Sequence, residues 1–331
     1  FSVPEIAREM NEGFVCIKVD REERPDVDEI YMTATQLITR SGGWPNSVFL
    51  TPDLEPFFAG TYFPKESRMG MTGFVDLLKR ISELWTQDRP RFEQAGEQIT
   101  EALQPRPEAS ATGHVPDETV LSKACEQLAS SFDPAWGGFG KAPKFPMPHN
   151  LTFLLRWYAR SGSEAARTMA GKTLVSMRNG GLFDQIGFGF HRYSVDAAWV
   201  VPHFEKMLYD NALLPPLYLA HHRLTGSGLS RRIAGETLDF ILREMCAPEG
   251  GFYAAWDADS EGVEGKYYIW SREEVAAVVG HEDADLVIAA LGVTPAGNFE
   301  GANILTRPWS RTELAERFRL PGEQVAQTLA A

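Results

Sequence analysis

The spacing of apolar and polar residues over the first hundred positions predicts a mixed α/β unit. Residues 3–11 have helical spacing, and residues 14–19 form a mostly apolar run that is typical of a buried strand. A second helix is expected to begin at Pro25, followed by strands at 47–51 and 56–62 with a hairpin turn between them. A long helical stretch at 72–103, interrupted at Pro90, completes the unit.

A second unit with a different pattern follows. Residues 105–118 are rich in Pro and Gly and are typical of a linker, so domains are expected at 1–104 and 119–331. The second domain reads as nearly all helix. Gly-Gly doublets followed by an apolar residue recur at 137–139, 180–182 and 250–252, where left-handed helix ends favour Gly. Helical hairpins repeated in this way indicate a solenoid or a closed α/α toroid.

The charge of the chain argues against a nucleic-acid partner. The net charge is −13, divided into −7 for residues 1–105 and −6 for the rest, so neither part has a basic excess. Apolar runs are far shorter than the roughly 20 residues that span a bilayer, and we expect no membrane partner.

The three cysteines are too widely separated to predict a disulfide framework or a zinc site. This usage fits a reducing cytoplasm, and we expect no metal and no cofactor. Cys16 falls within the predicted buried strand at 14–19, which favours an inert, packed thiol over a nucleophile.

The richest cluster of chemical groups is at 191–210. If a helix begins near Pro202, then His203, Lys206 and Asp210 share one face, and Glu205 and Tyr209 lie beside them. With the preceding His191, Arg192 and Tyr193, these groups could bind a polyhydroxylated ligand or supply acid and base groups. The alternative is a salt-bridged helix end with a purely structural role.

A second cluster follows the third Gly-Gly doublet. Trp256 offers a ring for stacking on the apolar face of a sugar, and Asp257 and Asp259 offer carboxylates for its hydroxyls. Two such carboxylates could hydrolyse a glycosidic bond, whereas Asp257 paired with His203 could exchange a sugar proton. Asp and Ser also form ordinary loop turns, and that alternative stays open.

Nine longer motifs carry a resemblance to a known family. They are VDREERPD at 19–26, GGWP at 42–45, FLTP at 49–52, GTYFP at 60–64, GFGKAPKFP at 138–146, FHRYSVD at 190–196, PHFEKMLYDN at 202–211, WDADSEG at 256–262 and GNFEG at 297–301. Together they resemble the spermatogenesis-associated protein 20 family over nearly the whole chain. The resemblance implies an α/β thioredoxin-like domain followed by an all-α toroid similar to six-hairpin glycosidases and N-acylglucosamine 2-epimerases.

The resemblance also implies an incomplete chain. The family carries a Cys-x-x-Cys pair just upstream of the first helix, and its members continue well past residue 331, so both domains are expected to be partial. In thioredoxin-like folds a cis proline faces that pair, which implies a cis bond at Trp44–Pro45.

Three hypotheses about function follow. The first is a toroid that binds or processes a carbohydrate, with His191, His203, Glu205, Asp257 and Asp259 as catalytic candidates. Its candidate substrate-binding residues are Arg192, Tyr193, Trp199, Lys206, Asp210 and Trp256. The second is a thiol-disulfide redox protein whose dithiol lies upstream and whose toroid recognises a client protein. The third is a non-catalytic interaction scaffold.

Overall fold

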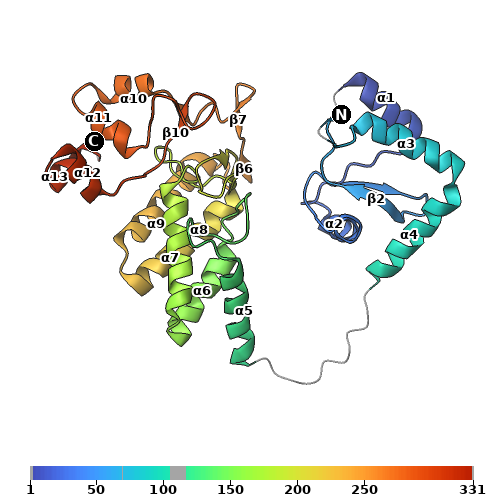
Figure 1. The fold of residues 1–331 in the computed structure, drawn as a ribbon, viewed down its shortest axis with the longest axis horizontal. Coiled ribbons are helices and arrows are strands. Elements are labelled where there is room, and N and C mark those ends of the chain that lie inside the picture. The colour runs from blue at the N-terminus through green and yellow to red at the C-terminus, as the bar shows by residue number, and fades with distance from the viewer. Residues whose placement is uncertain (1–2, 69, 105–116, 330–331) are drawn as a thin grey trace. The chain divides into compact units, whose positions relative to one another are not determined.

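The computed structural model describes residues 3–68, 70–104 and 117–329. The chain divides into two compact units, Phe1–His114 and Val115–Ala331 (Figure 1). Of the expected linker, residues 105–116 lie outside the described residues.

The first unit has the α/β character that the sequence predicts. Its elements are α1 (Pro4–Gly13), α2 (Pro25–Thr39), β1 (Ser47–Leu50), β2 (Pro56–Gly60), α3 (Phe74–Gln87) and α4 (Arg89–Leu103). The two strands form an antiparallel hairpin, with Ser47 opposite Gly60. Within this unit, α1 and α3 lie on one side of the hairpin and α2 on the other (Figure 1). Pro90 lies in the first turn of α4, where its missing N–H costs nothing.

The strand predicted at 14–19 is wrong. These residues have no strand assignment, and Val15 and Ile17 are 93% and 70% exposed. An apolar run becomes a strand only when a neighbouring strand completes its backbone hydrogen bonds. Among the described residues, the backbone of 15–19 makes no such bond, and only the Phe14 ring packs against β1, edge-on to Phe49 at 5.6 Å.

The second unit is mainly helical, with short strand pairs gathered at one end of the helices (Figure 1). Its helices are α5 (Glu118–Ser131), α6 (Pro148–Ser161), α7 (Glu164–Asn179), α8 (Leu208–Thr225), α9 (Gly228–Phe240), a π-helical turn (Ile241–Met245), α10 (Arg272–Val279), α11 (Ala284–Ala290), α12 (Arg311–Phe318) and α13 (Gly322–Thr328). The antiparallel strand pairs are β3 (Tyr193–Ser194) with β4 (Pro202–His203), β5 (Lys206–Met207) with β6 (Ala255–Trp256), β7 (Asp259–Ser260) with β8 (Val263–Glu264), and β9 (Ile269–Trp270) with β10 (Asn303–Ile304). An α/β unit followed by a helical unit is the fold class expected from the sequence.

Two helical hairpins, α6–α7 and α8–α9, are closed by the same local chemistry. Gly162 and Gly226 end the first helices in the left-handed conformation, with φ of 72° and 75°. Ser163 and Ser227 then cap the second helices by accepting a hydrogen bond from a backbone N–H three residues on. The hairpins pack through a core of Leu151, Leu154, Leu174, Met177, Leu214 and Tyr218.

The repeat predicted from Gly-Gly doublets exists, but one of its members is different. Antiparallel bridges close equivalent loops at Phe132–Phe139, Phe183–Phe190 and Cys246–Phe252. The second loop therefore contains Gly187 and Gly189, not the doublet at 180–181. Gly180 is instead extended, and the carbonyl oxygens of Trp199 and Val200 lie 2.1 Å from where a Cβ would lie on Gly180 and Gly181, respectively. Only Gly permits that approach.

The exposure of residues 14–19 corrects the expectation of a packed Cys16 thiol. Cys16 and Cys246 are exposed, whereas Cys125 is buried in the helical core, where burial raises the pKa of its thiol. We predict that iodoacetamide alkylates Cys16 and Cys246 rapidly in the folded chain and Cys125 only slowly. Peptide mass spectrometry over a time course would measure this, with the urea-unfolded chain as the control in which all three react. A Cys16 protected as strongly as Cys125 would contradict the structure.

Candidate functional site

The centre of the candidate site is a buried ion pair between Asp184 and Lys206. The Lys206 Nζ lies 2.7 Å from Asp184 Oδ2, and it donates a second hydrogen bond to the carbonyl of Phe188 at 2.7 Å. The other carboxylate oxygen, Asp184 Oδ1, accepts the backbone N–H groups of Ile186 and Gly187 at 3.0 and 2.9 Å. The pair therefore fixes the loop that closes at the Phe183–Phe190 bridge.

Aromatic rings enclose the lysine. Its Nζ lies 4.5 Å from the centre of the Phe240 ring and 4.9 Å from that of Tyr268. Burial lowers the pKa of Lys206, and Asp184 opposes that shift. Burial alone would raise the pKa of Asp184, but Lys206 and the hydrogen bonds hold it below its usual value. Asp184 is thus held as a carboxylate beside Lys206, and removing either partner would leave the other in the interior without its counter-charge.

The preceding loop repeat contains a second pair of the same kind. Lys144 Nζ lies 2.5 Å from Asp133 Oδ2 and also donates to the carbonyls of Gly137 and Ala197 at 2.9 and 2.8 Å. Asp133 and Asp184 occupy the same position in their loops, each directly after the bridging Phe. In the third loop this position is Ala247, and no ion pair forms there.

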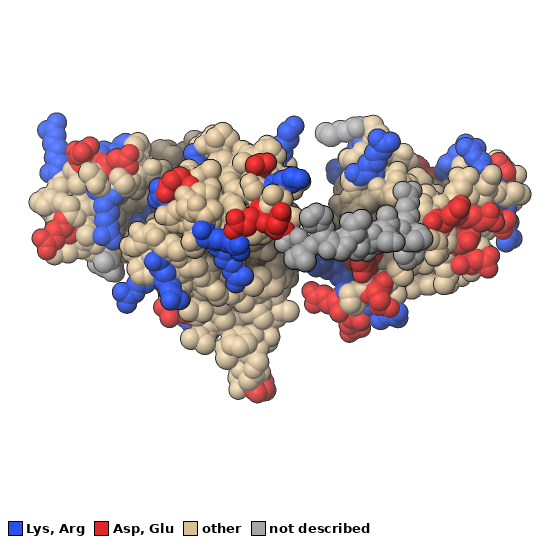
Figure 2. Space-filling view, turned by 90° about the horizontal axis from the view of Figure 1, so that it is seen from below, with Lys and Arg blue, Asp and Glu red and all other residues tan. Residues whose placement is uncertain are grey.

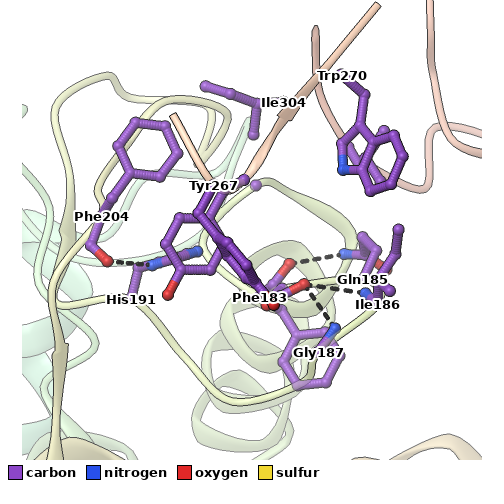
Figure 3. A pocket seen from close by; sticks show the side chains of 13 residues that line it. Phe183, Gln185, Ile186, Gly187, His191, Phe204, Tyr267, Trp270 and Ile304 are labelled. Atoms are coloured by element: carbon purple, nitrogen blue, oxygen red, sulfur yellow. Dashed lines mark hydrogen bonds between the residues drawn. The ribbon is translucent and has the colours of Figure 1, made fainter. Parts of the chain in front are cut away.

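His191 lies beside the central pair as a neutral ring. It is 2% exposed, and its Nδ1 lies 2.9 Å from the carbonyl oxygen of Phe204. A carbonyl only accepts hydrogen bonds, so Nδ1 carries the proton and Nε2 keeps a free lone pair. Burial, and next the charge of Lys206, lower the pKa of His191 to about 3. Figure 3 shows the second ring nitrogen turned away from Phe204, toward the other residues that line the pocket.

Two adjoining pockets surround this centre, and we call them the inner and the outer lobe. The inner lobe, about 320 Å³, is lined by His191, Gln185, Phe204, Trp270 and further residues (Figure 3). The outer lobe is about 570 Å³. Asp184, Gly187, Tyr267 and Tyr268 line both lobes.

The outer lobe combines rings with charged groups. Its aromatic residues include Trp256, which is 39% exposed and pairs across the strands with Lys206, and Tyr253, which is 47% exposed. Its charged residues are Lys206, Arg243, Glu244, Asp257, Asp259 and the shared Asp184. Of the predicted site residues, Lys206, Trp256, Asp257 and Asp259 thus meet in this lobe.

The helix predicted to begin near Pro202 is wrong. Helix α8 begins at Leu208, and the residues before it form β4 and β5. β4 pairs with β3 and β5 pairs with β6, so the backbone here forms hydrogen bonds between strands in place of helical ones. His203, Lys206 and Asp210 consequently do not share a helix face, and His203 lines neither lobe.

His203 belongs to a separate cluster with Arg192, Tyr193 and Glu205. Its ring stacks on Tyr193 with centroids 5.1 Å apart, and its Nε2 lies 3.9 Å from a carboxylate oxygen of Glu264. Arg192 donates to Glu205 at 2.8 Å. Burial lowers the pKa of Arg192, but Glu205 and Tyr209 more than offset this and the net shift is upward. The structure does not bring His203 and Asp257 into one pocket.

Asp210 is buried at the start of α8. It is 3% exposed, and its Oδ2 has no hydrogen-bond partner among the described residues. Burial raises the pKa of Asp210 to about 7, while the charge of Arg192 and a hydrogen bond from Tyr209 act in the opposite direction. This carboxyl therefore titrates near neutrality, but it lines neither lobe.

Two further predicted residues lie away from the lobes. Trp199 is fully buried, donates its indole N–H to the carbonyl of Trp136 at 3.0 Å, and packs in the helical core. Pro45 is in the first unit, and its bond to Trp44 is cis, as the resemblance implies.

Sequence reasoning missed the residues at the centre. Asp184, Tyr267 and Tyr268 line both lobes, and Gln185 and Glu244 line one each. The available signal was the repeated Phe-Asp dipeptide at 132–133 and 183–184, followed in both copies by Gly at the fifth position after Asp.

Among residues 3–68, 70–104 and 117–329, no group of three or more His, Cys, Asp or Glu side chains is placed to hold a metal ion. None of the helices described there is long and apolar enough to cross a membrane. Acidic and basic side chains are interspersed on the face that Figure 2 shows.

The sequence is similar to curated proteins from several animals. It is 40% identical to spermatogenesis-associated protein 20 of Homo sapiens over 99% of this chain and 46% of that protein. It is 43% identical to the uncharacterized protein B0495.5 of Caenorhabditis elegans over 83% of this chain and 39% of that protein. The chain spans about half the length of the curated relatives it matches. A family model named Thioredox_DsbH, described as a protein of unknown function (DUF255), matches residues 1–104.

Parts of the chain align with solved structures of sugar epimerases. The cellobiose 2-epimerase of Spirochaeta thermophila aligns with 42% of this chain and 39% of its own, at 23% identity and a TM-score of 0.37. A sugar epimerase from a ruminal bacterium aligns with 64% of this chain and 53% of its own, at 15% identity and a TM-score of 0.37.

The central ion pair gives a stability prediction. Asp184→Asn keeps an oxygen for the N–H groups of Ile186 and Gly187 but leaves the buried Lys206 ammonium without a counter-charge, which typically costs about 3–5 kcal/mol. Urea unfolding at pH 7 would measure the loss. Glu118→Gln, which breaks the exposed pair with Arg160, is the matched control and should cost less than about 1 kcal/mol. An equal loss of unfolding free energy in the two variants would show that the buried pair contributes no more to stability than the exposed one.

The raised pKa of Asp210 gives a pH prediction. The folded state holds this proton up to a pH of about 7 and the unfolded state only to about 4, so the group costs stability progressively as pH rises through that window. Asp210→Asn should therefore gain stability over the wild type between pH 4 and 7, by at most about 4 kcal/mol.

His191 has a lowered pKa, so its contribution to the free energy of unfolding rises with pH between about 3 and 6.5. This contribution is the same in the wild type and in Asp210→Asn, and it therefore cancels when the two are compared. Urea unfolding across pH would measure that difference, with the exposed Asp257→Asn as control. A difference independent of pH would refute the assignment to Asp210.

Proposed function

The chain belongs to the spermatogenesis-associated protein 20 family, and from that premise we propose that its C-terminal unit binds a carbohydrate in the two adjoining lobes. The relatives it matches are about twice its length, so the proposal concerns this unit and not the whole protein.

The observation that carries the proposal is the set of exposed aromatic rings around a concave, acid-lined surface. Tyr267 is 73% exposed, and Tyr253 and Trp256 are exposed at 47% and 39%. Large apolar side chains gathered at one hollow, rather than scattered, mark a binding surface. Sugar rings present C–H faces that stack on such aromatic groups.

The polar groups of the lobes suit hydroxyl ligands. Asp257 and Asp259 accept hydrogen bonds in the outer lobe, and the free Nε2 of His191 accepts one in the inner lobe. The guanidinium of Arg243 supplies donors in the outer lobe. A sugar hydroxyl both donates and accepts, so it can use either kind of partner.

The size of the lobes sets the length of the ligand. Pockets of about 300–1,000 Å³ hold ordinary small molecules, and both lobes fall in this range, at about 320 and 570 Å³. Because Tyr267 and Tyr268 form a wall of each lobe, a disaccharide or a short oligosaccharide can contact both.

The proposal is for binding rather than chemistry. A general base works best when its pKa is near the working pH, but the pKa of His191 is about 3, roughly four units too low. Asp210 titrates near pH 7 but lines neither lobe. His191 is thus better suited to accept a hydrogen bond than a proton, and processing of the sugar is not part of the proposal.

A binding titration tests this function. We expect isothermal titration of glucose, mannose, N-acetylglucosamine and cellobiose to give saturable binding of at least one sugar. Trp256→Ala and Tyr267→Ala should each weaken that binding by tenfold or more, which corresponds to about 1.4 kcal/mol.

Trp309→Ala is the matched control, because Trp309 is similarly exposed, at 41%, and lines neither lobe. It should bind as the wild type does. Circular dichroism would establish that each variant is folded. No saturation with any of the four sugars, or unchanged affinity in both lobe variants, would refute the proposal.

A further inference from the structure

We propose that Arg178, Arg232 and Arg307 form a second binding site, outside the two lobes, for a phosphate group. This inference does not depend on carbohydrate binding. Arg178 is in the last turn of α7, Arg232 is in α9, and Arg307 follows β10, so three separate segments contribute. None of the three residues lines either lobe.

Hydrogen bonds hold two of these arginines together. The backbone N–H of Arg307 donates to the carbonyl of Asn179, next to Arg178, at 2.7 Å. The side chain of Gln185 joins the same two residues, since its Nε2 donates to the carbonyl of Arg178 at 2.8 Å and its Oε1 accepts from Arg307 Nε at 3.4 Å. The backbone of both segments and the guanidinium of Arg307 are thus held in place before any ligand arrives.

The cluster has more positive than negative charge. Arg232 pairs with Glu236 at 3.4 Å, and Glu236 is the only carboxylate in direct contact with any of the three arginines among the described residues. Burial, and next the charges of Arg307 and Arg232, lower the pKa of Arg178 to about 10. Burial and Arg232 also lower that of Arg307. A guanidinium keeps its charge in proteins, so two of the three positive charges are left without a counter-charge.

The guanidinium groups also have unused donors. Arg178 is only 9% exposed, yet its Nε has no hydrogen-bond partner and its side chain donates only to Asn179, at 3.2 Å, among the described residues. Each guanidinium carries five N–H donors. Leaving buried, charged donors unpaired is costly unless a ligand engages them.

An oxyanion would supply both the missing negative charge and acceptors for the unpaired N–H donors. Planar guanidinium groups donate pairs of parallel hydrogen bonds to phosphate oxygens, and two or three arginines together favour a doubly charged anion over a singly charged one. The phosphate group can be free inorganic phosphate or part of a phosphorylated small molecule, and these two sources are distinguished by the ligand used in the titration.

The test is titration of the complete 331-residue chain with inorganic phosphate in a phosphate-free buffer at low salt. We expect one saturable site, and Arg307→Gln should bind at least tenfold more weakly. Arg307 is preferred to Arg178 because it is less buried and the variant is more certain to fold. Glu236→Gln removes the competing carboxylate and should bind several-fold more tightly, which mere structural damage would not cause.

Arg231→Gln is the matched control, since Arg231 is exposed, adjacent to Arg232 in α9 and outside the cluster. It should bind within twofold of the wild type. A parallel titration with glucose 6-phosphate identifies the source: equal affinity indicates free phosphate, and tighter binding indicates a phosphorylated metabolite. No saturation with either ligand at about 10 mM, or equal binding by Arg307→Gln and the wild type, would overturn the proposal.

Discussion

The second unit depends on a charged group that is kept away from water. Lys206 has almost no exposed surface, and its charge is balanced by Asp184, whose second oxygen holds the turn of the same loop. Because a buried charge without a partner is far more costly than a buried pair, the loop, β5 and the surrounding rings must adopt one mutual arrangement. The walls of both lobes follow from that arrangement. The Asp133–Lys144 pair holds the preceding loop of the repeat in the same way.

Local signals made much of the fold predictable from the sequence. The helices of the first unit follow from apolar spacing, and the hairpin turns of the second follow from Gly at a left-handed helix end and Ser at the next cap. Residues 14–19 were mispredicted because strand formation requires a partner strand, which apolar spacing does not reveal. The helix predicted from Pro202 is wrong for a related reason, because this backbone forms two short strand pairs with other segments.

The candidate site was only partly predictable. Trp256, Asp257 and Asp259 were identified because rings and acids stand together in the sequence, and they meet in the outer lobe. Asp184, Tyr267 and Tyr268 come from two distant segments, and their meeting depends on the pairing of Lys206 with Asp184. His191 was identified by residue type, but its tautomer and low basicity arise from the Phe204 carbonyl and from burial.

The third loop of the repeat differs from the other two at the residue that follows the bridging position. Ala247 stands where they have Asp, so no ion pair fixes this loop, and the Gly250–Phe252 segment is exposed. The chain then runs directly into Tyr253, Ala255 and Trp256, which form one wall of the outer lobe. For the carbohydrate proposed above, we expect the walls held by the Asp184–Lys206 pair to be the more selective part of the site. We expect the wall formed by Tyr253 and Trp256 to tolerate a wider variety of chemical groups.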